Sequence, residues 1–242
     1  MNNNKGISMV ELAIVLVIIG LLFAAVAEGV NIRKSSELTS FLSDISGFQV
    51  GIEGFDLKYR DLPGDMGDAF TYWDDGANGV CGISTECNGD ANGNIDLSTT
   101  SGTDNEAYRA WQHLVLGGFL EGGYTGVATT ANYQADIGIN VPASRRDKVG
   151  YALYYNNTGG GSSRNEIKLG AFKSSNVNNN SAVTPAEALA LDKKSDDGVP
   201  GTGIIKAADA ADATATNCVN SSAYNTTITI TSCIMAFPIN PR

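Results

Sequence analysis

The sequence has few of the residues that metal centres and catalytic sites require. It contains a single histidine, His113, and four cysteines among 242 residues, with no Cys-x-x-Cys pair. This supply of ligands does not favour a zinc centre. Gly-x-Ser-x-Gly, His-Glu-x-x-His and glycine-rich phosphate-binding loops are also missing from the sequence. We therefore expect no enzyme and no catalytic residues, and we expect His113 to have a structural role.

Positive charge is scarce too. The 16 Lys and Arg residues are outnumbered by 26 Asp and Glu residues, which gives a net charge of −10. No basic cluster exceeds Arg145-Arg146, so we expect no direct binding of nucleic acid. Abundant Gly, Asn, Ser, Thr and Ala indicate a secreted protein with a polar, loop-rich surface.

The four cysteines form two local pairs in the sequence. Cys81 lies close to Cys87, and Cys218 lies close to Cys233. Because zinc is disfavoured, this spacing predicts two disulfides formed in an oxidising compartment.

Proline is absent before Pro63, and the sequence up to that point predicts one long helix over residues 7–60. In its second half, apolar residues recur at alternating steps of three and four: Leu38, Phe41, Ile45, Phe48, Ile52, Phe55 and Tyr59. A membrane anchor joined to a separate coiled-coil dimer would show this pattern. We favour the alternative, in which the helix lies against its own globular domain at residues 61–242. Leu62-Pro63-Gly64 then ends the helix.

The first half of this helix carries an unusual combination of residues. Lys5-Gly6-Ile7-Ser8-Met9-Val10-Glu11 is followed by apolar sequence up to Ala27. A run of about 20 apolar residues is long enough to cross a bilayer as a helix. Glu11 is costly in such a segment unless it has a partner, which indicates a functional carboxylate. A secretory signal peptide cleaved near Ala24 to Ala27 is the alternative, but it leaves Glu11 unexplained.

Residues 5–12 resemble the class III signal of type IV prepilins and type II secretion pseudopilins. The resemblance implies a leader at residues 1–6, cleavage after Gly6, N-methylation of Ile7 and a role for Glu11 in filament assembly. Two positions depart from the family pattern: Ile7 stands where phenylalanine is most common, and Glu28 stands where many pilins have a proline. With the leader and the apolar run up to Ala27, the resembling segment covers about a tenth of the chain.

The resemblance also implies a fold, partners and a location. We expect an α+β, pilin-like fold: a long N-terminal helix, membrane-spanning at residues 7–27, packed on a head with an antiparallel sheet and long loops. Implied partners are copies of the chain, other pilin subunits, a prepilin peptidase and an inner-membrane assembly platform. The protein would lie in the bacterial inner membrane before assembly and then in a periplasmic or extracellular filament. A type II secretion pseudopilin, or a membrane-anchored calcium-dependent binding protein that never polymerises, are the alternatives.

Two acidic turns in the head are candidate calcium sites. Oxygen-bearing side chains alternate at Asp90, Asn92, Asn94 and Asp96, and Glu106 follows on the next predicted helix. Calcium binds such oxygens, although a turn rich in Asn, Asp and Gly forms without an ion. The second, weaker candidate contains Asp192, Asp196 and Asp197.

Local patterns predict the remaining elements of the head. A capping box at Thr103 to Glu106 starts a helix that ends at Gly117-Gly118. Residues 149–155 and 166–172 form a hairpin, and a helix over residues 184–191 has its own capping box. A final strand runs from Thr226 to Phe237, and pilins similarly close a C-terminal loop with a disulfide.

Overall fold

The computed structural model describes residues 8–74, 81, 87–97, 105–128, 133–156, 163–213 and 217–239, without the side chains of residues 24–28, 30 and 31. The chain divides into two compact units, Met1–Ser40 and Phe41–Arg242. Each unit is described by itself.

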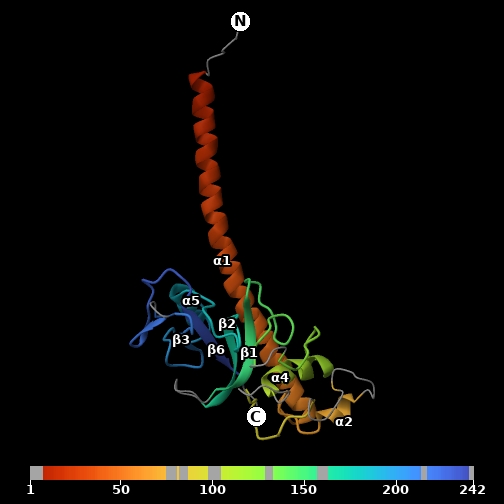
Figure 1. Ribbon diagram of the computed structural model, residues 1–242. Coiled ribbons are helices and arrows are strands. Elements are labelled where there is room, and N and C mark those ends of the chain that lie inside the picture. Colours follow the sequence, from red (N-terminus) through yellow and green to blue (C-terminus); the bar gives the residue numbers. More distant parts are fainter. Residues whose placement is uncertain are drawn as a thin grey trace. The chain divides into compact units, whose positions relative to one another are not determined.

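The helix α1, Met9–Tyr59, contains 51 residues and contributes to both units (Figure 1). The absence of proline lets its hydrogen bonds continue without interruption. It ends where Arg60 adopts a left-handed conformation with φ 65°, just before Leu62 and Pro63. The long helix predicted over residues 7–60 is thus present, and residue 7 itself lies outside the described residues.

Over the part of the chain that the structure describes, no helix is long and apolar enough to cross a membrane. The membrane span expected at residues 7–27 is therefore not found there. Residue 7 and the side chains of residues 24–27 lie outside the described residues.

The second unit contains a four-stranded antiparallel sheet (Figure 1). Its strands are β1 (Val149–Asn156), β2 (Arg164–Ala171), β6 (Cys233–Pro238) and β3 (Lys206–Asp209), in that spatial order. A separate two-stranded ribbon pairs β4 (Val219–Asn220) with β5 (Ala223–Tyr224). The predicted hairpin is confirmed as β1 and β2, whereas the predicted C-terminal strand begins seven residues later than expected.

One face of the sheet packs into the core of the second unit. Tyr151, Leu169 and Met235 form one cross-strand row, and the next row is Leu153, Ile167 and Phe237. All six side chains are buried, as are five residues of the heptad pattern on α1: Phe41, Ile45, Phe48, Ile52 and Phe55. The ring of Phe48 lies edge-on to that of Tyr151, at 5.0 Å between ring centroids. The heptad pattern therefore buries the helix against its own domain, which confirms the predicted α+β, pilin-like class.

Three shorter helices complete the described part of the second unit: α2 (Ala69–Trp73), α4 (Glu106–Leu116) and α5 (Pro185–Ser195). The predicted capping box of α5 is confirmed, because the Thr184 hydroxyl accepts from the backbone N–H of Glu187 and the Glu187 carboxylate accepts in return. The capping box predicted for α4 is wrong. Its N-cap is Asn105, which puts Glu106 at the first helical position instead of the third.

Both predicted cysteine pairs are disulfides in the structure. Cys81–Cys87 closes a short loop and Cys218–Cys233 a longer one, with sequence separations of 6 and 15. The second bond ties the start of β6 to the segment before β4.

Candidate functional site

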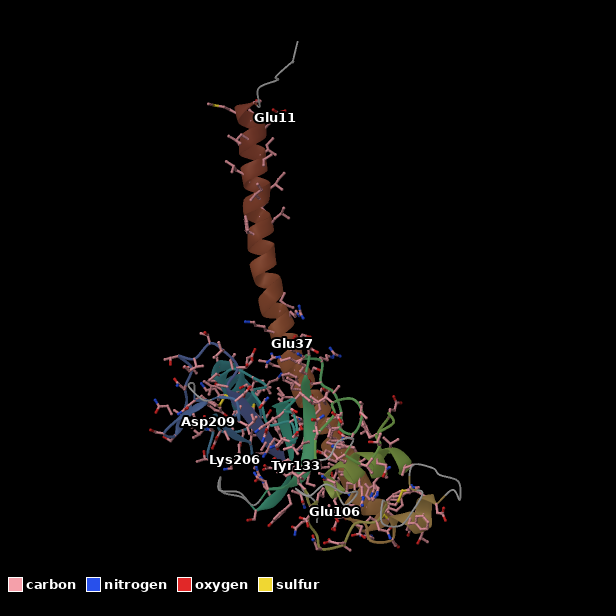
Figure 2. The ribbon with its side chains drawn as sticks, viewed as in Figure 1. Glu11, Glu37, Glu106, Tyr133, Lys206 and Asp209 are labelled. Carbon is pink, nitrogen blue, oxygen red and sulfur yellow. A yellow bond between two sulfur atoms is a disulfide. The ribbon has the colours of Figure 1, made fainter. Side chains whose placement is uncertain are left out.

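The first turn of α1 holds the acidic residue that the sequence singled out (Figure 2). The Glu11 carboxylate accepts a hydrogen bond from the backbone N–H of Ser8 at 2.8 Å. The Ser8 hydroxyl accepts from the N–H of Val10 at 3.3 Å. Glu11 thus binds one of the backbone donors that a helix N-terminus leaves without an intrahelical partner. The Ser-x-x-Glu spacing of residues 8–11 is the sequence signal for this contact.

The surface that follows Glu11 is apolar. Twelve large hydrophobic side chains between Met9 and Phe23 are exposed, by 43% to 90% of their area. Burying one such side chain stabilises a protein by roughly 1.5–3 kcal/mol, so this surface needs an apolar environment or a partner. Gly6 and Ile7, the expected cleavage site and new N-terminus, lie outside the described residues.

A second candidate site is a group of three carboxylates in the head. One oxygen each from Asp65, Asp90 and Glu106 lie within 4.8 Å of one another. Asp65 and Glu106 are buried, with 1% and 6% exposed area. Sequence reasoning found Asp90 and Glu106 but missed Asp65, which follows the end of α1 and comes near only through the fold.

Backbone donors hold these carboxylates in place. The two oxygens of Glu106 accept from the N–H groups of Asp90 and Asp96, each at 2.8 Å. Those of Asp65 accept from the N–H groups of Asn92 and Gly93. Burial nevertheless raises the pKa of Glu106 to about 7 and that of Asp65 to about 6, because the charged forms are poorly solvated. A proton or a cation at this place would relieve that cost.

The remaining residues of the predicted calcium loop are arranged differently from a set of oxygen ligands. The Asn92 side-chain oxygen accepts from the N–H of Asn94 at 2.7 Å. Its amide nitrogen therefore faces the carboxylates and donates to Asp90 at 2.9 Å and to Asp96 at 3.1 Å. Asn92 acts here as a donor that joins two acids.

The second acidic turn brings its three predicted residues together. One oxygen each from Asp192, Asp196 and Asp197 also lie within 4.8 Å of one another. Each carboxylate accepts hydrogen bonds from the protein: Asp192 from Tyr224 and Gly198, Asp196 from Ile204 and Ile205, and Asp197 from Val199 and Thr202. These hydrogen bonds are enough to explain why the three carboxylates lie close together in this turn.

Three side chains of α4 contact the loop at residues 87–96. Besides Glu106, the Arg109 guanidinium donates to the carbonyl oxygen of Asn88. His113 is fully buried, with Nε2 2.9 Å from the carbonyl oxygen of Cys87. Its Nδ1 accepts from the N–H of Gly64 at 2.9 Å. The spacing of residues 106, 109 and 113 puts all three on one side of the helix.

A comparison with family models identifies the N-terminal segment. The model of the prokaryotic N-terminal methylation motif matches residues 1–27. This segment is a prepilin-type signal. It is the cleavage and methylation signal of type IV prepilins and pseudopilins, so the resemblance of residues 5–12 is confirmed. Comparisons with curated proteins and with solved structures gave no match.

The prepilin-type signal supports a protein of the type IV pilin or pseudopilin type. Such a signal implies, in general, processing by a prepilin peptidase and assembly into filaments from a membrane-anchored state.

Proposed function

We propose that the mature chain is a structural subunit of a type IV pilus-like filament. A prepilin peptidase would cleave after Gly6 and methylate Ile7, and the subunit would polymerise through residues 7–27 on an inner-membrane platform. The prepilin-type signal carries this proposal. The exposed apolar surface from Met9 to Phe23 supports it, since neighbouring helices in a filament would bury that surface.

Glu11 has a specific part in this proposal. Once residues 1–6 are removed, Ile7 carries a positive amine. A buried carboxylate and a buried amine are each costly alone, and pairing them between subunits removes both penalties and fixes the axial register. In the single chain the Glu11 carboxylate accepts from the N–H of Ser8, at the same end of the helix.

The first test separates released fibres from membranes after shearing and measures the N-terminal mass of the protein in each fraction. A processed chain that begins at methylated Ile7 in the sheared fibres supports a pilus subunit. A processed chain confined to the envelope supports a type II secretion pseudopilin. An uncut leader, or an N-terminus after Ala27, contradicts both.

The variant Glu11→Gln separates charge pairing from helix capping. Glutamine retains an oxygen for the N–H of Ser8 but has no charge. We expect normal cleavage and loss of assembly, whereas Glu53→Gln, an exposed glutamate on the same helix, should assemble normally. Full assembly of the Glu11→Gln variant would contradict charge pairing at Glu11, whereas a wild-type chain that never enters a fibre would favour a membrane-anchored protein that does not polymerise.

We further propose that Asp65, Asp90 and Glu106 bind a calcium ion that stabilises the head. Their convergence and the burial of two of them support the proposal. At calcium 100-fold above the dissociation constant, binding stabilises the folded state by about 2.7 kcal/mol. The unfolding temperature in calcium should therefore exceed that in chelator, and Asp65→Asn should abolish the difference. Asp68→Asn, in the same loop, should retain it. Equal unfolding temperatures of the wild type in calcium and in chelator would contradict calcium binding.

A further inference from the structure

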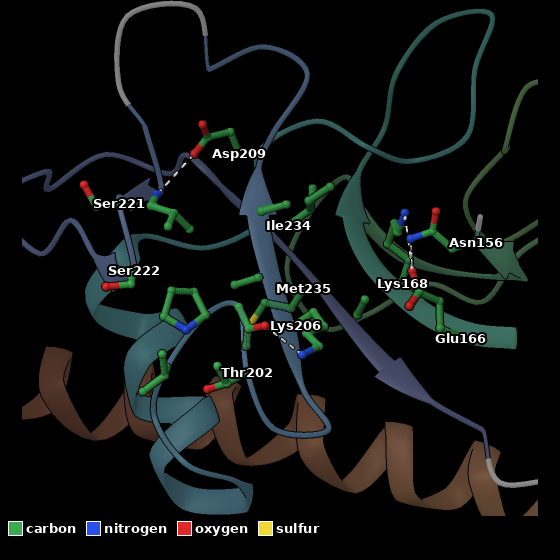
Figure 3. Close-up of a pocket in the computed structure, with 17 residues that line it drawn as sticks. Asn156, Glu166, Lys168, Thr202, Lys206, Asp209, Ser221, Ser222, Ile234 and Met235 are labelled. Atoms are coloured by element: carbon green, nitrogen blue, oxygen red, sulfur yellow. Dashed lines mark hydrogen bonds and ion pairs between the residues drawn. The ribbon is translucent and has the colours of Figure 1, made fainter. Parts of the chain in front are cut away.

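A cavity of about 720 Å³ lies over the face of the sheet that is turned away from the core (Figure 3). Its floor is formed by β2, β6 and β3. The rest of its lining comes from the loop at residues 199–202, from Val219 on β4 with Ser221 and Ser222 after it, and from Asn156 at the end of β1. In Figure 3, Lys168 and Asn156 lie on one side, Asp209 and Ser221 on the other, and Ile234 between them.

The register of the strands puts two lysines on either side of a small residue. Lys168 on β2 and Lys206 on β3 are both cross-strand partners of Ala236 on β6. Directly paired residues share a face of the sheet, and each strand is about 4.8 Å from its neighbour. The two ammonium groups can therefore reach the space above the Ala236 methyl group together.

Lys168 has an unusual environment for a lysine. Its exposed area is 9% and its ammonium group lies over the ring of Tyr154, 4.7 Å from the ring centroid. The nearest carboxylate oxygen, from Glu166, is 3.7 Å away, which is an ion pair but too long for a hydrogen bond. Among the residues that the structure describes, the ammonium group has no hydrogen-bond acceptor. Most of the side chain is buried, but Lys168 lines the cavity, so its N–H groups can donate to a ligand there.

The acidic residues of the cavity also have partners other than the two lysines. Glu166 accepts from the Asn156 amide at 2.6 Å and lies 3.6 Å from the Arg164 guanidinium. Asp209 accepts from the backbone N–H of Val219 at 3.1 Å. Lys206 donates one hydrogen bond, at 2.8 Å to the carbonyl oxygen of Gly201, and has two further N–H groups. The N–H groups of the cavity floor that can still donate to a ligand therefore belong to the ammonium groups of Lys168 and Lys206.

Beside the lysines the floor is apolar. Ala208 and Ile234 form the adjacent cross-strand pair on the same face, and Val199 and Pro200 line the cavity as well. We propose that this cavity binds an organic anion, with its carboxylate between Lys168 and Lys206 and its apolar part over Ala208 and Ile234. The two lysines supply charge-assisted hydrogen bonds, and the apolar floor selects against small, fully hydrated anions.

The test is a titration of the full-length protein in detergent micelles, followed through the methyl resonances of Ala208, Ile234 and Ala236. The probes are butyrate, butylammonium of equal length and opposite charge, and inorganic phosphate. We expect saturable shifts with butyrate, none with butylammonium and weaker binding of phosphate. Lys168→Met and Lys206→Met should each weaken butyrate binding about tenfold, the loss of one charge-assisted contact. Lys173→Met, outside the cavity, should bind as the wild type does.

Three results would overturn the proposal. Equal shifts with butylammonium would show an apolar hollow without charge selection. Phosphate binding as tight as that of butyrate would show that the apolar floor takes no part. Unchanged butyrate affinity in both methionine variants would place the anion elsewhere. If Lys168→Met lacks the wild-type circular dichroism spectrum, Lys206→Met and Lys168→Arg decide between these outcomes.

Discussion

His113 makes the stability of the head depend on pH in a predictable direction. Because Nδ1 accepts from the N–H of Gly64, the proton of the neutral ring must lie on Nε2, where it donates to the carbonyl oxygen of Cys87. A second proton, on Nδ1, would point at the N–H of Gly64 and break that hydrogen bond. Burial is the main cause that lowers the pKa of His113 to about 4, and the positive charge of Arg109 adds to it.

The magnitude follows from proton linkage. The folded state keeps His113 neutral down to about pH 4, whereas the unfolded chain binds a proton below about 6.5. Between these values the unfolded state holds the extra proton, so stability falls as the pH falls. At pH 5 this difference destabilises the fold by about 2 kcal/mol relative to pH 7.5.

The variant His113→Asn isolates this contribution. Its side-chain oxygen can still accept from the N–H of Gly64, but it does not titrate and it loses the contact with Cys87. At pH 7.5 we expect it to be less stable than the wild type by about 1–3 kcal/mol, the cost of an unsatisfied buried group. At pH 5 the difference should shrink by about 2 kcal/mol.

Denaturant unfolding of the full-length chain in micelles measures the free energy of unfolding of both proteins at each pH. It is followed by tryptophan fluorescence, to which Trp73 contributes with its ring 5.0 Å from that of His113. Since His113 is the only histidine, carboxyl groups contribute equally to both curves and cancel in the difference. If the free energies of unfolding of the wild type and of His113→Asn change in parallel from pH 7.5 to pH 5, His113 does not cause the pH dependence.

Four further variants test the packing of the head, each measured by denaturant unfolding. Replacing Cys218 and Cys233 with serine should cost about 3 kcal/mol, and an unchanged midpoint would show that this bond contributes nothing. Gly64→Ala should cost more than about 2 kcal/mol, because Gly64 has φ 90° and an added Cβ would overlap the backbone of α4. Gly93→Ala, with φ 87° but open space around it, should cost only about 1 kcal/mol, and a smaller loss at Gly64 than at Gly93 would contradict this account. Thr184→Ala removes the cap of α5 and should cost about 1 kcal/mol, so an unchanged midpoint would show that the cap contributes nothing.

The sequence predicts those parts of the fold that depend on local periodicity. The heptad pattern of Phe41 to Phe55 predicts both the helix and its buried face, because side chains three and four apart share one side of a helix. The hairpin of β1 and β2 follows from two β-rich runs around a polar turn. The cap of α5 is predictable for the same reason, since its partners are only three residues apart.

What the sequence does not predict depends on distant contacts. Lys206–Asp209 contains two alanines and has little intrinsic strand preference, so β3 exists because β6 pairs with it. Ile228 and Ile230 alternate as in a strand, yet the N–H of Ile228 donates back to Asn225 and closes a turn. At the acidic site, Glu106 looks like a capping residue until the fold brings the loop at residues 90–96 against it.

The position of β6 has a consequence for how the head is made. Of the four strands described in this sheet, β6 comes last in the sequence, yet it lies between β2 and β3. Until residues 233–238 arrive, β2 has an open edge, β3 has no strand to pair with, and the disulfide from Cys218 cannot form. A chain synthesised from its N-terminus therefore completes this sheet only after residues 233–238 have been made, long after β1 and β2.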